Sequence, residues 1–294
     1  MMSAMRYLIF PVVFGSALTA AWWGLNQGMH PSMVVFVVST SAALIITLGE
    51  RMMPFEAKWS KSHDDVPTDL VYAISSLIAA PRLFDIISLA ALIPLASAMP
   101  WGASVWPEHL PWGIQLLLAV VVGEFGSYWW HRLIHEWEPL FRLHATHHSA
   151  PRLYWLNATR FHPLDSIPMY AMHVVPLTLL GVSEPVLVGF TVWSLVHGFF
   201  QHANIDLRLG PLNYIFSMAE LHRWHHSRSL EEANRNYGNN CIIWDVVFGT
   251  FFWPKARRPS ADIGLSGLPN FPQRLGRQLL SPFLWPAGRR DTSK

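Results

Sequence analysis

The chain has 294 residues, of which 51% are hydrophobic and only 14% are charged. Soluble domains usually carry about a quarter charged residues, so this composition favours a membrane protein over an ordinary soluble domain. The net charge of +2 does not suggest a nucleic-acid partner, and a single cysteine excludes an internal disulfide and argues against a thiolate-held iron–sulfur cluster.

Several hydrophobic stretches are candidates for membrane-spanning helices, each of which needs ~20 mostly apolar residues. They cover residues 7–25, 32–48, 70–99 and 110–130, followed by the pair 167–180 and 185–200. The third stretch is too long for one straight span, and Pro81 and Pro94 predict a kink or a break in it. The final pair fits two short spans or a hairpin that does not fully cross. The sequence therefore predicts an all-α, polytopic transmembrane helical bundle with four to six spans.

Basic residues fall in alternate connections between these stretches. The connections 26–31, 100–109 and 181–184 contain no Lys or Arg, and only Arg82 departs from the pattern. The positive-inside rule then places both termini and the histidine-rich segments in the cytoplasm, so that these segments form a cytoplasmic helical cap. A signal peptide is the competing interpretation of residues 7–20, but further spans follow it and no clean cleavage site does.

Histidine is the residue type in excess, with 15 in the chain, and eight of the histidines fall in three clusters. In "HRLIH" two histidines are four residues apart, and "HATHH" and "HRWHH" each repeat the spacing i, i+3, i+4, which gathers side chains on one side of a helix. Eight imidazoles exceed the four ligands of one structural zinc and indicate two metal sites, although imidazole also suits iron, copper and nickel. The eight are His131, His135, His144, His147, His148, His222, His225 and His226.

Two features near the first cluster bear on the type of site. Glu124 lies on the same helical stripe as His131, where it would either orient an imidazole through its second ring nitrogen or pair with an arginine. The dipeptide His135-Glu136 resembles the start of a zinc-protease motif, but Pro139 occupies the position of the second histidine. The site is therefore rich in histidine rather than in carboxylates.

The order of the clusters, followed by "NYGNNCIIWDVVFGTFFWP", resembles the fatty acid hydroxylase/sterol desaturase superfamily over residues 123–254. The resemblance implies an integral-membrane enzyme that uses O2 and two iron ions per chain. It also implies that the eight clustered histidines are iron ligands, with His202 of "HANI" as a ninth.

Other residues in the matching segments are candidates for supporting roles. His197 would be a tenth ligand or a core histidine, and His162 would be a ligand or a residue that supports one. The residues proposed as hydrogen-bond partners of His162 are Asn157, Arg160 and Asp165. Asp245, in the closing segment, would support the ligands or the fold.

This arrangement predicts hydroxylation or desaturation of a lipid, either sterol-like or fatty acyl, and "NATRFHPLD" favours the sterol desaturase-like branch. The sequence carries no dinucleotide fingerprint and no haem-attachment motif. A separate ferredoxin, b-type cytochrome or reductase is therefore expected to supply electrons at the basic face that includes Arg257 and Arg258. The alternatives are a zinc-dependent membrane lipid hydrolase and a metal transporter or sensor.

The predicted organisation is one membrane di-iron catalytic unit, residues 1–254, with its histidine clusters within 123–250. Residues 255–294 would form a cytoplasmic tail. Within the tail, "FPQRLGRQLLSPFLWP" alternates apolar and cationic positions, which fits an amphipathic segment on the membrane surface or a loosely ordered tail.

Overall fold

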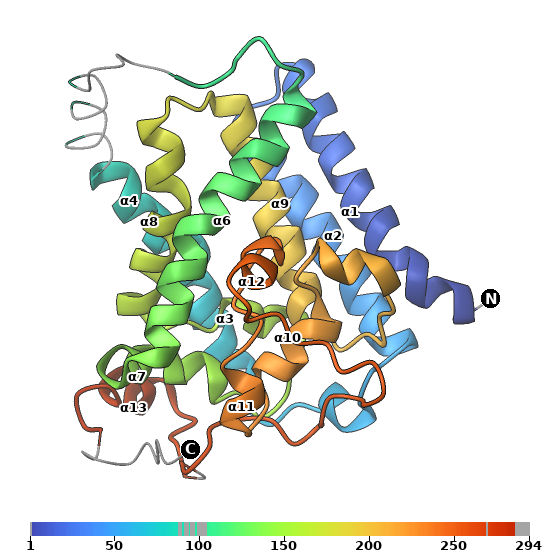
Figure 1. Ribbon diagram of the computed structural model, residues 1–294, viewed down its shortest axis with the longest axis vertical. Coiled ribbons are helices and arrows are strands. Elements are labelled where there is room, and N and C mark those ends of the chain that lie inside the picture. The colour runs from blue at the N-terminus through green and yellow to red at the C-terminus, as the bar shows by residue number, and fades with distance from the viewer. Residues whose placement is uncertain are drawn as a thin grey trace.

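The computed structural model describes residues 2–87, 90, 94, 98, 105–268 and 270–285, and the regular elements in these ranges are helical. Long helices run up and down in a bundle, and short helices cover one end of it (Figure 1). The predicted all-α class is confirmed. Within the described residues, three helical segments are long and apolar enough to cross a membrane, namely Ala4–Asn26, Pro31–Met52 and Val66–Ile87.

The long helices are α1 (Met2–Asn26), α2 (Pro31–Met52), α6 (Trp112–Glu136), α8 (Pro163–Leu179) and α9 (Glu184–His202). The shorter α-helices are α3 (Val66–Ile74), α4 (Ala80–Ile87), α7 (Glu138–His148), α10 (Ala219–His225), α11 (Leu230–Ala233), α12 (Ile243–Val247) and α13 (Leu275–Leu280). Single helical turns of other types are η1 (Ala57–Ser60), η2 (Ser75–Ala79), η4 (Trp155–Thr159) and η5 (Gly210–Tyr214).

The predicted spans overlap these helices, but the third stretch is a composite of several elements and the later helices are shorter or less apolar. Helices α3, η2 and α4 form one helical run, and η2 is a π-helical turn directly before Pro81. A π-turn changes the hydrogen-bond register where proline lacks an N–H, so the run continues through Pro81. Most of residues 88–99, including the neighbours of Pro94, lie outside the described residues. Helices α6 and α9 are long enough to span but less apolar, and α8 has 17 residues, so the count of four to six spans stays a prediction.

Close helix packing depends on aromatic and small residues. In the core between α1 and α9, the rings of Phe10 and Phe200 are 5.3 Å apart in an edge-to-face arrangement. Helices α6 and α8 approach closely at Gly126, where a Cβ would lie 2.3 Å from the carbonyl oxygen of Met172. Any larger side chain at Gly126 would force these two helices apart, and α6 carries the first histidine cluster.

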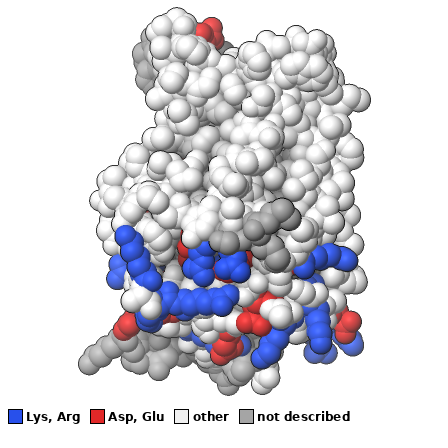
Figure 2. Space-filling view, turned by 90° about the vertical axis from the view of Figure 1, so that its right-hand side faces the viewer, with Lys and Arg blue, Asp and Glu red and all other residues white. Residues whose placement is uncertain are grey.

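Charged side chains gather at one end of the molecule. In Figure 2 the upper part of the visible face is nearly free of charge, and the Lys, Arg, Asp and Glu residues lie in a band across the lower part. Many large apolar side chains on the long helices are exposed, such as Phe36 at 70% and Ile86 at 67%. An uncharged, apolar flank next to a charged end is the distribution expected of a membrane protein.

Buried ion pairs fix the segment that follows α7 at this charged end. Arg152 donates from Nε to Asp65 Oδ2 at 2.6 Å and from Nη2 to Asp65 Oδ1 at 2.9 Å. Arg160 donates from Nε to Asp69 Oδ1 at 2.5 Å, and both of these side chains are fully buried. Breaking one partner of such a pair would leave an uncompensated buried charge, so residues 152–160 are held firmly against α3.

Candidate metal centre

Nine histidine side chains converge in two buried groups at the charged end of the bundle. In each group, one ring nitrogen of every member lies within 4.8 Å of the corresponding nitrogens of the other members. The five-histidine group is His131, His135, His144, His148 and His225, and the four-histidine group is His147, His202, His222 and His226. These are the eight clustered histidines together with His202.

The three clusters are divided between the groups by their spacing. The pairs at i, i+4 stay together, because four residues advance a helix by about 400° and return to nearly the same face. The i+3 histidine of each H-x-x-H-H cluster joins the other group: His147 leaves His144 and His148, and His225 leaves His222 and His226. Helices α7 and α10 therefore each contribute to both groups, which lie side by side, with the rings of His148 and His226 stacked 4.4 Å apart.

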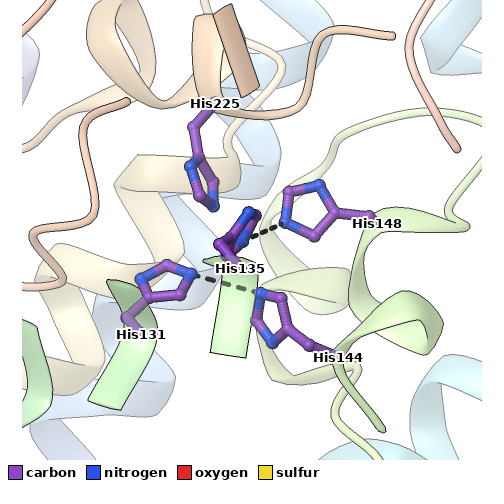
Figure 3. Close-up of side chains that lie close together, drawn as sticks. All are labelled: His131, His135, His144, His148 and His225. Atoms are coloured by element: carbon purple, nitrogen blue, oxygen red, sulfur yellow. Dashed lines mark hydrogen bonds between the residues drawn. The ribbon is translucent and has the colours of Figure 1, made fainter. Parts of the chain in front are cut away.

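The five-histidine group is assembled from three helices. Figure 3 shows His131 and His135 of α6, His144 and His148 of α7, and His225 of α10 with their rings turned toward a common centre. The Nε2 atoms of His131 and His144 are 3.2 Å apart, and those of His135 and His148 are 3.1 Å apart. Neighbouring nitrogen ligands around an ion with bonds of about 2.1 Å have similar spacings.

The hydrogen bonds of the outer ring nitrogens show that a cation fits between these rings. His131 Nδ1 donates to the carbonyl oxygen of Tyr237 at 2.6 Å, and His144 Nδ1 donates to Asp165 Oδ2 at 2.7 Å. Both partners accept only, so in the neutral rings the proton is on Nδ1 and both Nε2 atoms carry lone pairs. Two lone pairs that face each other at 3.2 Å repel, and a metal ion between them turns this repulsion into coordination.

The same pattern extends to His225 and to the four-histidine group. His225 Nδ1 donates to the carbonyl oxygen of Arg235 at 2.8 Å, and its buried Nε2 has no hydrogen-bond partner. His202 Nδ1 donates to Asn157 Oδ1 at 2.9 Å, which directs its Nε2 toward His222 Nε2 at 3.0 Å. The orientation of the Asn157 amide is fixed by the Tyr154 N–H and the Arg152 carbonyl, so this tautomer is also determined.

Burial keeps four of these imidazoles neutral. Desolvation, strengthened by the neighbouring rings, holds the pKa of His147, His148, His222 and His226 well below the ordinary value for histidine. A metal ion therefore meets lone pairs rather than protons at neutral pH. Within the described part of the chain, neither group includes a carboxylate or a thiolate. The donor set consists of nitrogen alone and suits a transition metal.

The structure also places the candidate supporting residues. Asp165 and Asn157 hydrogen-bond directly to members of the two groups, as described above. Asp245 supports the site indirectly, because its carboxylate accepts hydrogen bonds from the backbone N–H groups of Tyr237 and Gly238 at 2.8 Å each. This fixes the Tyr237 carbonyl that receives the proton of His131.

The proposed roles of His162 and Arg160 need correction. His162 accepts from Leu164 N at 3.1 Å and donates to the carbonyl oxygen of Leu279 at 3.2 Å, so it caps α8 and holds α13. In the described part of the chain, no hydrogen bond joins this ring to Asn157, Arg160 or Asp165, because the ring faces the start of its own helix. Arg160 pairs with Asp69 instead.

Glu124 neither orients one of the nine imidazoles nor pairs with an arginine. Its carboxylate accepts the backbone N–H groups of Asn239 and Asn240, the latter at 2.8 Å, and thereby caps the loop that follows Tyr237. His197 lies outside both groups, in contact with the rings of Phe10, Phe14 and Phe216. It precedes His202 by five residues, about 140° around the helix, and therefore points to a different side.

Several partners of the histidines were not predicted from the sequence. The carbonyl oxygens of Tyr237 and Arg235 accept from His131 and His225, and Asn234 Oδ1 lies 3.3 Å from His135 Nδ1. Every residue has a carbonyl oxygen, so residue type gives no signal for the first two. The segment "NRNYGNN" directly after the third cluster was the available indication, since its polar side chains and glycine are typical of a structured loop.

The comparisons with known proteins agree on one family. The family model "Fatty acid hydroxylase" matches residues 116–250, a range that includes all nine histidines. The chain is 38% identical over 269 residues to the ornithine lipid hydroxylase OlsE of Rhizobium tropici, covering 90% of this chain and 80% of that protein.

Two further matches are shorter. Human alkylglycerol monooxygenase is 34% identical over 128 residues, which is 44% of this chain and 28% of that protein. The Delta(7)-sterol-C5(6)-desaturase of Nicotiana tabacum is 31% identical over 145 residues, which is 48% of this chain and 51% of that protein. No solved structure matches the chain.

Proposed function

Because this chain belongs to the fatty acid hydroxylase family, we propose that it is a membrane oxidoreductase that hydroxylates or desaturates a lipid with O2 at a centre of two iron ions. The observation that carries the proposal is the pair of adjacent all-histidine groups, one of five and one of four nitrogens. We propose that all nine histidines are iron ligands, and that Asp165 and Asn157 hold two of them in the ligand tautomer.

Two iron ions bound at these groups would supply the activation of O2 that oxidation of an unactivated C–H bond requires. The protein's own contribution is to orient and to exclude water. The side chains of all nine histidines are 3% exposed or less, so water is kept from the metal sites. Five of the nine rings have an acceptor at the outer nitrogen, so these five do not need to reorganise when the metal binds; they are His131, His135, His144, His202 and His225.

The relatives favour this function over the two alternatives. They are named as hydroxylases, monooxygenases and a desaturase, rather than as hydrolases or transporters. The similarity to the ornithine lipid hydroxylase extends over 90% of this chain, whereas the alkylglycerol monooxygenase and sterol desaturase matches cover less than half of it. This difference supports a lipid with a polar head group of the ornithine-lipid type as the substrate, rather than a sterol.

We further propose that the histidine groups and both termini lie on the cytoplasmic side. The alternation of basic connections in the sequence supports this orientation, and so does the band of Lys and Arg at the end of the molecule that holds the site (Figure 2). A lipid in the inner leaflet could then reach the metal centre from the bilayer. The electrons are proposed to come from a separate ferredoxin, b-type cytochrome or reductase.

The proposed catalytic unit is residues 1–254, and residues 255–294 form a tail. Part of the tail packs against α7, where Leu265 and Trp285 join Phe141 and Ala145 in a small apolar cluster. The side chains of Leu280, Phe283 and Leu284 are 54%, 68% and 73% exposed. An apolar surface of this kind next to Arg274 and Arg277 supports the proposal that residues 271–286 lie on the membrane surface.

Lipid mass spectrometry under isotopic oxygen tests the function. Membranes of cells that express the chain are compared under ¹⁸O2 with membranes of cells that lack it. Hydroxylation adds one ¹⁸O atom to one lipid class, and desaturation removes two hydrogens without adding label. Lipid profiles that are the same with and without the chain, or label that arrives from water instead of O2, would contradict the proposal and favour a hydrolase.

A further inference from the structure

A cavity of about 210 Å³ opens at the charged end of the molecule, beside α10. Among its lining residues are five cationic and two anionic side chains, which leaves an excess of three positive charges. They are Arg208, Arg223, Lys255, Arg257 and Arg258, with Asp206 and Glu220. The two carboxylates already have partners, since Asp206 pairs with Arg6 and Arg208, and Glu220 accepts from Leu209 N and from Asn213.

The base of the cavity is a buried arginine stacked on an aromatic ring. Arg223 is 2% exposed, and its Nη2 donates to the carbonyl oxygens of Ala203 at 2.8 Å and Ile205 at 2.7 Å. The guanidinium carbons of Arg223 and Arg258 lie 3.8 Å and 4.2 Å from the centre of the Phe55 ring. A guanidinium held in this way keeps its position, so the cavity is preorganised for anionic oxygen.

The wall of the cavity is also the outer side of the metal centre. Arg223 and Trp224 lie on α10 between His222 of the four-histidine group and His225 of the five-histidine group. Both residues line the cavity, and Arg223 additionally bonds to the carbonyl of Ala203, the residue directly after His202. The lining residues Arg223 and Trp224 are therefore direct sequence neighbours of His222 and His225, and a hydrogen bond links Arg223 to the residue that follows His202.

We propose that this cavity and its cationic rim are the docking site of an acidic one-electron carrier protein, which delivers electrons to the metal centre through α10. The inference rests on the proposed oxygenase function and names the surface its partner uses. In one hydroxylation the lipid C–H bond and O2 become C–OH and H2O, with two electrons and two protons consumed. Two reduced carrier molecules dock in succession and each is oxidised by one electron, and the protons come from solvent.

The charge pattern and the location together favour a protein donor over a lipid head group. Carboxylates on a carrier would pair with the exposed rim, where Lys255 and Arg257 extend beside Trp253 and Trp224. Opposite charge of this kind raises association rates by about 10–10³-fold and makes them dependent on ionic strength. A lipid head group could use the same cations, but these lie at the charged end of the molecule rather than on its exposed apolar flank.

The test is stopped-flow reduction of the iron-loaded enzyme by a reduced plant-type ferredoxin, without O2, at low and high salt. Charge reversal is made at Lys255→Glu with Arg257→Glu, and at Lys255→Glu alone in case Arg257 is needed for its ion pair with Glu232. The matched control is Arg274→Glu with Arg277→Glu on α13, which makes the same change in net charge. In Figure 1, α13 lies at the lower left, away from α10.

We expect the double reversal to slow reduction by about tenfold at low salt and to abolish most of its salt dependence, with the single reversal intermediate. The control should stay within about twofold of the parent, and reduction by dithionite should be equal in all forms. If the double-reversal variant and the control variant were reduced by ferredoxin at the same rate, the proposed docking site would be wrong. The docking site would also be wrong if the double reversal weakened only the binding of the enzyme to vesicles containing phosphatidylglycerol, a result that would assign the cavity to lipid. An enzyme that dithionite cannot reduce would instead contradict the proposed oxygenase.

Discussion

His225→Ala is expected to lower turnover by at least about 10³-fold, because losing one ligand removes a metal-dependent reaction rather than a single contact. His225 is the only member of the five-histidine group that comes from α10, and its Nδ1–H to the Arg235 carbonyl directs Nε2 into the group. Its removal leaves four imidazoles from α6 and α7. Iron content should fall from two toward one per chain, with the helical content retained.

The matched control for this variant is another buried histidine outside both groups. His197 is fully buried among aromatic rings, so His197→Phe removes an imidazole and keeps an aromatic ring of similar shape. It should keep both irons and most of its activity. Elemental analysis and turnover are measured on both variants. An active His225→Ala enzyme with two irons, or a His197→Phe enzyme that has lost one, would show that the ligand assignment is wrong.

Asp165→Asn should weaken iron binding at the five-histidine group by about 10–100-fold, as is typical when a carboxylate behind a metal-bound histidine is lost. The carboxylate accepts from His144 Nδ1 at 2.7 Å, and it keeps the proton on that nitrogen. An amide can still accept this bond, but it carries no charge and can also turn its NH2 toward the ring. The fold should therefore survive while the tautomer is less firmly held.

Competition with an iron chelator measures this effect, and excess iron should restore activity in Asp165→Asn. The control is Asp262→Asn, since the side chain of Asp262 is 78% exposed and pairs with Arg228 at the surface. Both variants remove one negative charge, so a shared effect would reflect net charge alone. If Asp165→Asn released iron at the same chelator concentration as Asp262→Asn, the carboxylate would have no part in holding the metal.

The members of the site could be predicted from the sequence because helical spacing is regular. Histidines three or four residues apart lie on one side of a helix, so each of the three clusters was expected to act as a unit. The pairs four residues apart do stay together, but His147 and His225 join the other group. Their division into groups of five and four could not be predicted, because it depends on the angle at which α7 and α10 meet. His202 was found through the resemblance alone, since no periodicity links it to the clusters.

The wrong predictions of side-chain partners share a physical cause. Sequence position shows on which side of a helix a side chain lies, but not which groups lie opposite it. Glu124 shares a stripe with His131, yet the group that reaches its carboxylate is the backbone at Asn239 and Asn240. His162 stands two residues from Arg160 in the chain, yet its ring turns back to cap α8. The first two apolar stretches, 7–25 and 32–48, were better determined and fall within α1 and α2, because a continuous apolar run is a property of the sequence itself.

The most direct test of the account is an anomalous-diffraction map of the iron-loaded enzyme collected at the iron absorption edge. The account predicts two peaks: one enclosed by His131, His135, His144, His148 and His225, and one enclosed by His147, His202, His222 and His226. A single peak, or iron bound outside these two groups, would contradict it.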